Sequence, residues 1–463
     1  MQKLLYFCSK FEKAMQIFHL SSRVCSTQAI REIASQTTEP YVMLLIKPEV
    51  RWVAYAQERL VQIAEDTHAD MVYADHFNET NGQVSQAPVI DYQLGALRDD
   101  FDFGAVTMWR TSALQAAVAA MDTDYQYAGF YDLRLRVSRL HGGRDVRFVH
   151  VPEYLYYEVE TDTRLSGEKL FDYVNPANRA VQIEMEQCVT AHLKAIGGWI
   201  DYQQLKNIDL SDKGNETYPV TASVIIPCRN RVRTIGDAIR SALAQRVREP
   251  YRYNVFVVDD NSTDGTVDVI KDIQNTVDGA RLIYVAQDPT WHAIGGNWNA
   301  ALHHPQCGLF AIQLDSDDTY FDENTVQRFI DTFMHERCAM VVGTYQLTDI
   351  DGNPLPPGKI DHREWTAENG MNNALRINGL GAPRGFYVPL LRTMNFPTTK
   401  YGEDYAVGLR ITREYQLGRI YDVLYNCRRW DDNSDANCDV VTMNRNNWYK
   451  DRIRTWELMA RMA

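Results

Sequence analysis

The sequence predicts an α/β protein whose main domain is built on a mostly parallel sheet flanked by helices. Three observations support this prediction. Short apolar runs alternate with amphipathic segments between about residues 220 and 314, and the loops that join them are short. Two of these apolar runs end directly in clusters of aspartate. A shorter series of the same alternating segments occupies the first 160 residues.

Residues 1–160 are expected to form a domain of their own. Strands are predicted at 41–46, 71–73, 103–109 and 146–151, with helices at 51–66 and 131–140. A turn is indicated by NETNG at 78–82. Residues 161–217 are expected to connect this domain to the next one, through a helix at 172–197 and a polar linker at 207–217.

Residues 218–440 are expected to form the main domain, and residues 441–463 a C-terminal helix. Strands are predicted at 220–227, 253–258, 281–286, 309–314, 341–345 and 386–388, with helices at 233–245, 267–273, 295–303 and 400–415. A helical crossover returns the chain to the same edge of a sheet, so strands joined in this way run parallel. The pattern therefore predicts an open sheet with helices on both faces.

Composition and charge restrict the functional classes. The 463 residues suit two or three domains, and the net charge of −13 argues against nucleic acid as a partner, because phosphate chains need a basic surface. The eight cysteines are scattered without a Cys-x-x-Cys pair, which favours reduced thiols. No apolar stretch reaches the length of a membrane span, and the opening residues are too short for a signal peptide. We therefore expect a cytoplasmic protein; peripheral contact at the inner face of the membrane and a homo-oligomer both stay open.

An acidic segment, LDSDD at 314–318, follows one predicted strand. Alternate residues of an extended chain point to the same side, so Asp315 and Asp317 can share one face. Paired carboxylates are ligands for a hard divalent cation, whose coordination water and phosphate would complete. The alternative is an acidic turn that caps a helix, because the next residues resemble a helix start.

A second acidic cluster begins at Asp259 and Asp260, directly after the predicted strand at 253–258. The carboxyl ends of parallel strands meet at one edge of a sheet, where ligands bind, and an aspartate there can hydrogen-bond a ribose hydroxyl or a base edge. The sequence has neither the glycine-rich loop of dehydrogenases nor that of P-loop enzymes. The phosphates of a bound nucleotide would then need a cation, which Asp315 and Asp317 could hold.

Four segments of the second half resemble, in order, the motifs of family 2 glycosyltransferases with the GT-A fold. They are SVIIP at 223–227, VVDDNSTDGT at 257–266, LDSDD at 314–318 and GED at 402–404. The last segment opens a predicted helix, where acids in isolation would only complement the helix dipole. The resemblance covers about residues 220–435 and implies a nucleotide-sugar donor, an Mn²⁺ or Mg²⁺ ion and an inverting transfer.

The resemblance implies catalytic and metal-binding roles for four acids. Asp404 would be the catalytic base, supported by Glu403. Asp315 and Asp317 would form the Asp-x-Asp metal motif, with Asp317 the favoured direct ligand. Many members of the family also have a histidine after the base helix that can bind the metal. This chain has RRW at 428–430 in that region, and the tryptophan there could stack on a sugar or belong to the core.

The resemblance also implies a set of residues that contact the nucleotide-sugar. They are Pro227, Arg229, Asp259, Asp260, Asn299, Asp315 and Arg429. Two choices stay open: either Asp259 or Asp260 contacts the uridine, and either Arg428 or Arg429, with Ser434, reaches the diphosphate. The family often has an Arg-Asn pair in the third helix, whereas this chain has GNWN at 296–299 without an arginine.

The two halves of the chain match each other at nearly constant offsets. YVMLLI at 41–46 aligns with residues 310–315, at an offset of 269. NGQ at 81–83 aligns with DGN at 351–353, at an offset of 270. LRV at 135–137 aligns with LRI at 409–411, at an offset of 274. Such self-similarity predicts a duplicated architecture.

The first copy lacks the acids of the second. Ile46 and Pro48 stand where the Asp-x-Asp pair is expected, and Gly129 and Phe130 stand where the GED acids are expected. Only about 40 residues precede its first matching strand, against about 90 in the second copy. We therefore interpret residues 1–160 as a truncated, catalytically inactive GT-A-like domain, which supports the active one, binds acceptor or mediates assembly.

The expected activity is transfer of a sugar, with a UDP-sugar as the favoured donor, to a hydroxyl of a glycan or a lipid-linked acceptor. One alternative is a sugar-nucleotide pyrophosphorylase, but CRNR at 228–231 is a poor match to the glycine- and arginine-rich loop of that class. The other is a non-catalytic glycan-binding or scaffold protein, which suits the first half better than the second.

Overall fold

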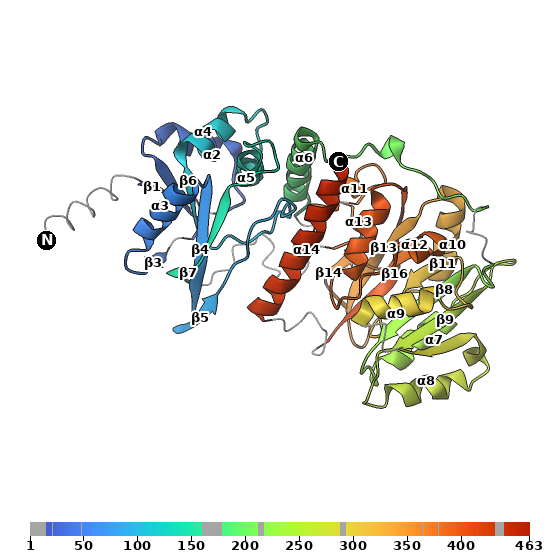
Figure 1. The fold of residues 1–463 in the computed structure, drawn as a ribbon. Coiled ribbons are helices and arrows are strands. Elements are labelled where there is room, and N and C mark those ends of the chain that lie inside the picture. The colour runs from blue at the N-terminus through green and yellow to red at the C-terminus, as the bar shows by residue number, and fades with distance from the viewer. Residues whose placement is uncertain are drawn as a thin grey trace. The chain divides into compact units, whose positions relative to one another are not determined.

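The computed structural model describes residues 15–20, 22–47, 49–159, 178–211, 217–287, 293–363, 365–377, 379–430 and 439–463. They form two compact units, each an α/β structure (Figure 1). The first unit comprises the residues up to 199, residues 375–377 and the segment from 438 onwards, and the second unit comprises 200–374 and 378–437. The C-terminal helix, expected as a segment after the main domain, is therefore part of the first unit.

The first unit is built on a seven-stranded sheet. Its strands are β1 (Met15–His19), β2 (Tyr41–Leu45), β3 (Val50–Trp52), β4 (Met71–Thr80), β5 (Gln83–Ala87), β6 (Val106–Arg110) and β7 (Phe148–Val159). In space they follow the order β1-β2-β6-β4-β7-β3, and β5 pairs with β4. Every residue of β2 is buried, which is why its sequence is a continuous apolar run.

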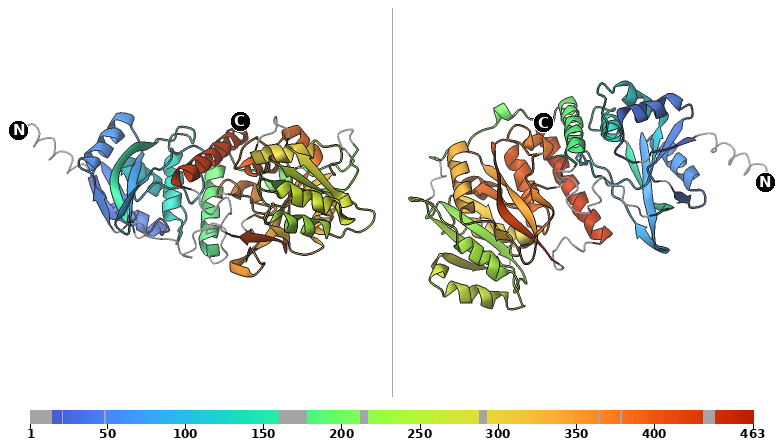
Figure 2. Two further views of the ribbon diagram at one scale, coloured as in Figure 1. Left: turned by 90° about the horizontal axis from the view of Figure 1, so that it is seen from below. Right: turned by 180° about the vertical axis from the view of Figure 1, so that it is seen from behind.

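Helices accompany this sheet, and those that lie beside it in Figures 1 and 2 belong to the first 140 residues. The described helices of the first unit are α2 (Thr27–Gln36), α3 (Ala56–Thr67), α4 (Thr111–Ala119), α5 (Gly129–Ser138), α6 (Arg179–Ile196) and α14 (Val440–Arg461). α2, α4 and α5 pack against one another, and α3 packs on β4 and β7. The predicted helix at 51–66 was wrong at its start: residues 50–52 pair with β7, and the helix begins only at Ala56.

The second unit is built on a nine-stranded sheet in the order β10-β9-β8-β11-β15-β13-β16-β12, with β14 paired to β13. Its strands are β8 (Ala222–Cys228), β9 (Tyr253–Asp259), β10 (Leu282–Ala286), β11 (Phe310–Gln313), β12 (Thr319–Tyr320), β13 (Met340–Asp349), β14 (Pro354–Ile360), β15 (Arg384–Tyr387) and β16 (Leu417–Arg429). The predicted α/β class is confirmed, and most strands of the sheet run in one direction. β15, β14 and β12 run antiparallel to their neighbours.

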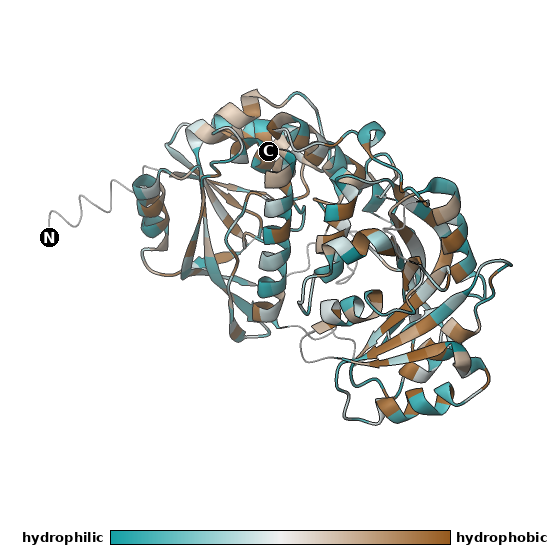
Figure 3. Ribbon diagram, turned by 45° about the vertical axis from the view of Figure 1, so that its right-hand side comes forward, coloured by the Kyte–Doolittle hydropathy of each residue, from teal (hydrophilic) through white to brown (hydrophobic). Residues whose placement is uncertain are grey.

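The described helices of the second unit include three that the sequence did not predict, α10, α11 and α12. They are α7 (Ile235–Leu243), α8 (Thr266–Gln274), α9 (Ala293–Leu302), α10 (Thr325–Glu336), α11 (Gly370–Asn373), α12 (Val388–Met394) and α13 (Glu403–Thr412), with short 3-10 turns at Tyr202–Gln204 and Asp278–Arg281. Every residue of β8 and β9 is buried, in line with the hydrophobic colour of this sheet in Figure 3. The helices α7 and α9 both pack on these two strands.

The two sheets share one strand order. β1, β2, β6, β4, β7 and β3 of the first unit correspond, in order and in direction of pairing, to β8, β11, β15, β13, β16 and β12 of the second. β5 and β14 also correspond, since each pairs antiparallel with the equivalent strand. β9 and β10 have no counterpart among the described residues of the first unit.

Local details repeat at the same spacing as the sequence matches. α3 and α10 are both twelve residues long and start 269 positions apart. Each ends at a non-glycine residue in the left-handed region, His68 with φ 54° and Arg337 with φ 50°, again 269 positions apart. These shared details support the interpretation that the chain contains one architecture twice.

The helix α14 is fixed to the first unit by a buried network of charges. The Asp451 carboxylate lies 3.4 Å from Arg98 Nε and 2.7 Å from Arg454 Nη1, and all three side chains are buried. Arg454 also donates to the Ile377 carbonyl over 2.9 Å. Of the helices that the structure describes, none is both long and apolar enough to cross a membrane.

Replacing Asp451 with alanine is expected to lower the free energy of unfolding by about 3–5 kcal/mol, because Arg454 would stay buried without its carboxylate partner and Arg98 would keep only Asp100. Urea unfolding followed by circular dichroism measures the change. Asp439→Ala is the matched control on the same helix, since Asp439 is exposed and only caps the Thr442 amide. A loss in the Asp451 variant no larger than in the control would contradict this role.

Candidate active site

The acidic segments of the second unit lie at one edge of its sheet. β8, β9 and β11 run parallel, so their carboxyl ends face the same edge. Residues 314–318 follow β11, Asp259 is the last residue of β9, and Pro227 is the last but one residue of β8. The topology thus places the first three predicted motifs side by side.

The turn at 314–318 exposes its first two acids and buries the third. Asp315 and Asp317 are partly exposed, whereas Ser316 and Asp318 are only 7% and 5% exposed. This is the alternation expected of an extended Asp-x-Asp segment. Two carboxylates of the turn are therefore open to a ligand, and the third is part of the core.

Repulsion between these carboxylates favours a cation. Burial raises the pKa of Asp315, and the charge of Asp317 adds to the rise, while a hydrogen bond of 2.9 Å from Gln313 Nε2 opposes it. Burial and both neighbouring carboxylates raise the pKa of Asp318 well above its usual range. An Mn²⁺ or Mg²⁺ ion fits the oxygen pair of Asp315 and Asp317 and would relieve this repulsion. Groups of three or more potential metal-ligating His, Cys, Asp or Glu side chains do not occur in the described part of the chain.

Arg428 holds the acidic turn rather than facing outward. Its side chain is buried, its amide donates to Asp318 Oδ1 over 2.7 Å, and its Nε donates to the Asp317 carbonyl. Of the two arginines left open as diphosphate ligands, the structure therefore gives Arg428 a role in holding the turn. Arg429 is partly exposed. Ser434 lies outside the described residues.

Two further arginines that sequence reasoning missed lie around Asp317. Arg231 Nε is 3.9 Å from Asp317 Oδ2, and Trp430 Nε1 is 3.4 Å from the same oxygen. Arg233 stacks over the Trp430 ring at 5.2 Å. The signal was present as the regular spacing RNRVR at 229–233, directly after β8.

Glu403 and Asp404 open α13 but have different environments. Glu403 is buried, and burial together with the charge of Asp404 raises the pKa of Glu403 to about 8. Asp404 is partly exposed, and its Oδ2 lies 2.6 Å from Arg384 Nη1. The pair therefore combines a carboxyl that stays protonated at neutral pH with a carboxylate held by an arginine.

Arg384 connects this pair to the acidic turn. It lies on β15, next to β11, where Gly385 pairs with Ile312. Its positive charge lowers the pKa of Asp315 and of Glu403, opposing the larger effect of burial on each. Arg384 thus faces both acidic clusters. The sequence motifs gave no role to this arginine.

The end of β9 separates a buried aspartate from an accessible one. Asp259 is 3% exposed, and its carboxylate accepts hydrogen bonds from the Ser262 amide and from Cys228 Sγ. Asp260 is partly exposed and lies 3.4 Å from Arg229 Nη1. Asp259 therefore shapes the loop, and Asp260 with Arg229 is better placed to meet a ligand.

The expectation that Asn299 contacts the nucleotide is not supported. Asn299 is 1% exposed, its Nδ2 donates to the Phe396 carbonyl over 2.8 Å, and its Oδ1 accepts from the Phe396 amide over 2.8 Å. Both ends of the amide are used, so Asn299 fixes α9 to the segment before α13.

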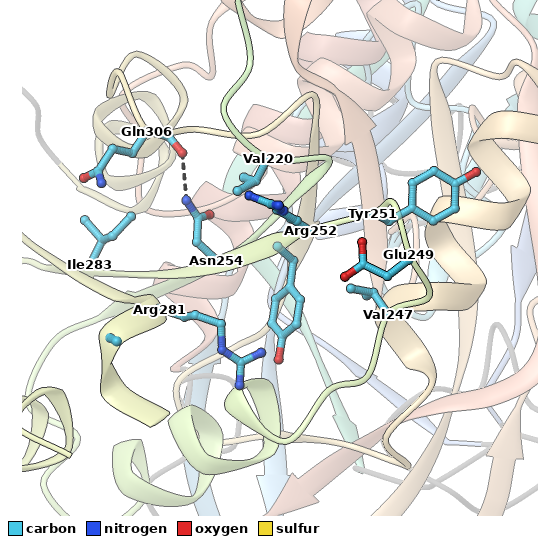
Figure 4. A pocket seen from close by; sticks show the side chains of 11 residues that line it. Val220, Val247, Glu249, Tyr251, Arg252, Asn254, Arg281, Ile283 and Gln306 are labelled. Carbon is cyan, nitrogen blue, oxygen red and sulfur yellow. Dashed lines mark hydrogen bonds between the residues drawn. The ribbon is translucent and has the colours of Figure 1, made fainter. Parts of the chain in front are cut away.

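A pocket of about 460 Å³ lies at the opposite edge of the sheet, around the starts of β8, β9 and β10 (Figure 4). Its walls include Arg252, Asn254 and Arg281. Asn254 Nδ2 donates to the Gln306 carbonyl over 2.8 Å, and Arg281 stacks over the Tyr253 ring at 4.7 Å. These side chains serve the fold, and the pocket is separate from the acidic edge.

Sequence comparison with known proteins gives matches to one family of glycosyltransferases. The model of the family described as Glycosyl transferase family 2 matches residues 223–396. The Bacillus subtilis (strain 168) teichuronic acid biosynthesis glycosyltransferase TuaG is 31% identical over 133 residues, which are 29% of this chain and 50% of TuaG. The Rhizobium meliloti (strain 1021) succinoglycan biosynthesis protein ExoU is 25% identical over 222 residues, which are 45% of this chain and 61% of ExoU. The chain thus spans about half the length of the first of these relatives and under two thirds of the second.

Solved structures with similar folds are more distant. S. aureus TarS 1–349 in complex with UDP has a TM-score of 0.39 at 18% identity, over 51% of this chain and 65% of that one. The Pyrobaculum calidifontis mannosyltransferase PcManGT in complex with GDP-Man and Mn²⁺ has a TM-score of 0.37 at 16% identity, over 62% of this chain and 84% of that one. The family assignment rests on the sequence matches. The sequence matches support a family 2 glycosyltransferase domain over residues 223–396, most of which lie in the second unit.

Proposed function

We propose that the second unit transfers a sugar from a nucleotide-sugar donor to a hydroxyl group of an acceptor, with inversion at the anomeric carbon. The observation that carries this proposal is the position of Arg384, which is paired with Asp404 and acts electrostatically on Asp315 within a family 2 domain. A base and a donor-phosphate site at one edge of a sheet are what an inverting transfer needs. A UDP-sugar is the first donor to test.

Asp404 is the proposed general base. At neutral pH Glu403 is protonated, so the pair presents a single carboxylate, which Arg384 orients. An acceptor hydroxyl within hydrogen-bond reach of Asp404 would lose its proton to that carboxylate as its oxygen attacks the anomeric carbon. The bond from that carbon to the diphosphate breaks on the opposite face, so the configuration inverts.

Asp315 and Asp317 are the proposed cation ligands, with the donor diphosphate next to them. A bound Mn²⁺ or Mg²⁺ ion would stabilise the negative charge that develops on the leaving diphosphate. Arg231, close to Asp317, would add fixed positive charge on the protein side. Arg429 stays a proposed diphosphate contact. Asp260, paired with Arg229, would then contact the nucleoside part of the nucleotide-sugar donor.

The first unit is proposed to have no transferase activity. In the position equivalent to Asp404, Phe130 is buried and packs edge-on against the Trp109 ring at 5.9 Å. Ile46, in the position equivalent to Asp315, is also buried. Pro48, in the position equivalent to Asp317, lies outside the described residues. Since TuaG and ExoU are named for polysaccharide biosynthesis, we propose a growing glycan as the acceptor of the second unit.

Asp404→Asn is expected to reduce sugar transfer about 10²–10⁴-fold, because the acceptor hydroxyl loses its base. UDP release from a panel of UDP-sugars measures transfer, and calorimetric donor binding shows whether the site is intact. Asp268→Asn is the matched control, since Asp268 is an exposed acid in the first turn of another helix, α8. Wild-type turnover in Asp404→Asn would end the assignment of the base.

Asp317→Asn is expected to abolish the gain in UDP affinity that Mn²⁺ gives, because one of two carboxylate ligands is lost. Isothermal titration of the full chain with UDP, with and without Mn²⁺, measures this directly and gives the stoichiometry. The wild type should bind one UDP per chain, as expected if only the second unit takes a donor. Two sites per chain, or an unchanged Mn²⁺ effect in the variant, would contradict the proposal.

Glu403 is expected to make the folded protein less stable as the pH rises. Its pKa is about 8 in the folded chain and 4.5 without burial, so folding favours the protonated form. Its contribution to stability is fully present below pH 4.5 and is lost between pH 4.5 and about 8. Glu403→Gln should flatten the fall in the free energy of unfolding across that window, measured by urea unfolding at several pH values. An unchanged slope would contradict the shifted pKa.

A further inference from the structure

The C-terminal helix α14 buries its charges and exposes its largest apolar side chains, which reverses the usual arrangement. Asp451, Arg454 and Glu457 are at most 6% exposed, whereas Trp456 is 56% and Met459 58% exposed. The buried charges satisfy one another, as described for Asp451, and Glu457 pairs with Arg461 at 2.7 Å. The exposed apolar side chains have no such explanation within the first unit.

These apolar side chains form one strip along the helix, which we call the α14 strip. It consists of Val441, Trp448, Trp456 and Met459. Their spacings of seven, eight and three residues bring each of them to the same side of a helix with 3.6 residues per turn. The helix has 22 residues, so the strip runs along most of a rod about 33 Å long.

The charges beside the strip are positive. Asp451 and Glu457 are the two acids of the helix sequence, and both are buried. Arg445 is exposed, and Arg452 is partly exposed and stacks over the Trp448 ring at 5.0 Å. The strip therefore combines indole rings and aliphatic groups with guanidinium groups.

The inner face of the helix is held firmly, so the strip is a fixed surface. Gln93 Nε2 donates to the Trp448 carbonyl over 3.0 Å, the Gly95 amide donates to Thr455 Oγ1 over 2.9 Å, and Asn444 Nδ2 donates over 2.6 Å to the Pro88 carbonyl. The segment at 88–100 is polar at these points, which explains why the helix turns its polar residues inward.

We propose that the α14 strip docks the chain on the surface of an anionic lipid bilayer. Tryptophans and arginines on one side of a helix are the groups that lie at the level of lipid headgroups. Charge complementarity decides between this occupant and a second copy of the chain. Across a two-fold axis the strip would bring the guanidinium groups of Arg445 and Arg452 together, and the exposed acid Asp439 lies beyond the end of the strip, at the helix N-cap.

The net charge of the whole chain also affects which surface of the protein can face the bilayer. With a net charge of −13, the chain as a whole is repelled by anionic lipid, so docking needs a local surface such as the strip, where apolar and basic side chains lie together. This proposal does not depend on glycosyl transfer, because α14 belongs to the first unit and carries none of the proposed catalytic residues.

Sedimentation of the full chain with phosphatidylcholine vesicles, with and without phosphatidylglycerol, tests the docking. The wild type should bind the mixed vesicles and not the pure phosphatidylcholine ones. Arg445→Glu should weaken binding at least about fivefold, since one basic residue contributes about that factor. Trp456→Ser combined with Met459→Ser should also weaken binding, with circular dichroism showing that the variants fold.

Matched controls come from the second unit. Lys271→Glu changes the charge by the same amount as Arg445→Glu at another exposed position, and Val277→Ser removes an apolar side chain that is 92% exposed. Both should bind like the wild type. Equal loss in the controls, equal binding to both vesicle types, or no binding at all would overturn the proposal. A dimer in analytical ultracentrifugation that the strip variants dissociate would also overturn it, in favour of a second copy.

Discussion

The acidic edge of the second unit depends on arginines placed between carboxylates. Arg428 holds the acidic turn from β16, Arg231 approaches Asp317 from the loop after β8, and Arg384 reaches Asp404 from β15. Several buried or half-buried carboxylates at one place would otherwise repel one another strongly. The distribution of these arginines over different strands ties the geometry of the site to the correct order of the whole sheet.

The arginines cancel only part of the repulsion between the carboxylates. The pKa of Asp315, Asp318 and Glu403 all stay raised, so the arginines leave room for further positive charge. This is consistent with a cation at the Asp-x-Asp pair and with a carboxylate at Asp404 that can exchange its arginine partner for an acceptor hydroxyl. The same electrostatic balance thus links the stability of the edge to the proposed chemistry.

The first unit shows what this architecture looks like when the acids are replaced by apolar residues. It keeps the strand order of the second sheet, and at Phe130 it has an aromatic core contact in the position equivalent to Asp404. The polar anchoring of this unit lies elsewhere, in the network of Arg98, Asp451 and Arg454 that fixes α14. The same fold therefore has a candidate active site at the sheet edge in the second unit and a surface that binds α14 in the first unit.

The strands were predictable wherever burial was complete. β2, β8 and β9 are buried throughout, so an apolar run was sufficient to find them. Their parallel pairing then placed the motifs at one edge. The antiparallel β15 was not predictable, because the direction of a strand in a sheet depends on partners far away in the chain.

Single residues at the site were harder to predict, for the same physical reason. Asn299 bonds Phe396, 97 positions away, and a buried asparagine that holds a backbone has the same sequence signature as one that binds a ligand. Arg384 acquires its role only from contact with Asp404. In α14, the fold buries charged residues that the sequence alone would place on the solvent-exposed side of the helix.

A crystal structure of the full chain with UDP and Mn²⁺ tests the central claim most directly. The account predicts one nucleotide per chain at the acidic edge, with Mn²⁺ on the carboxylates of Asp315 and Asp317 and Asp404 within reach of the same cavity. Nucleotide bound away from that edge, or a metal ion that neither aspartate touches, would contradict it.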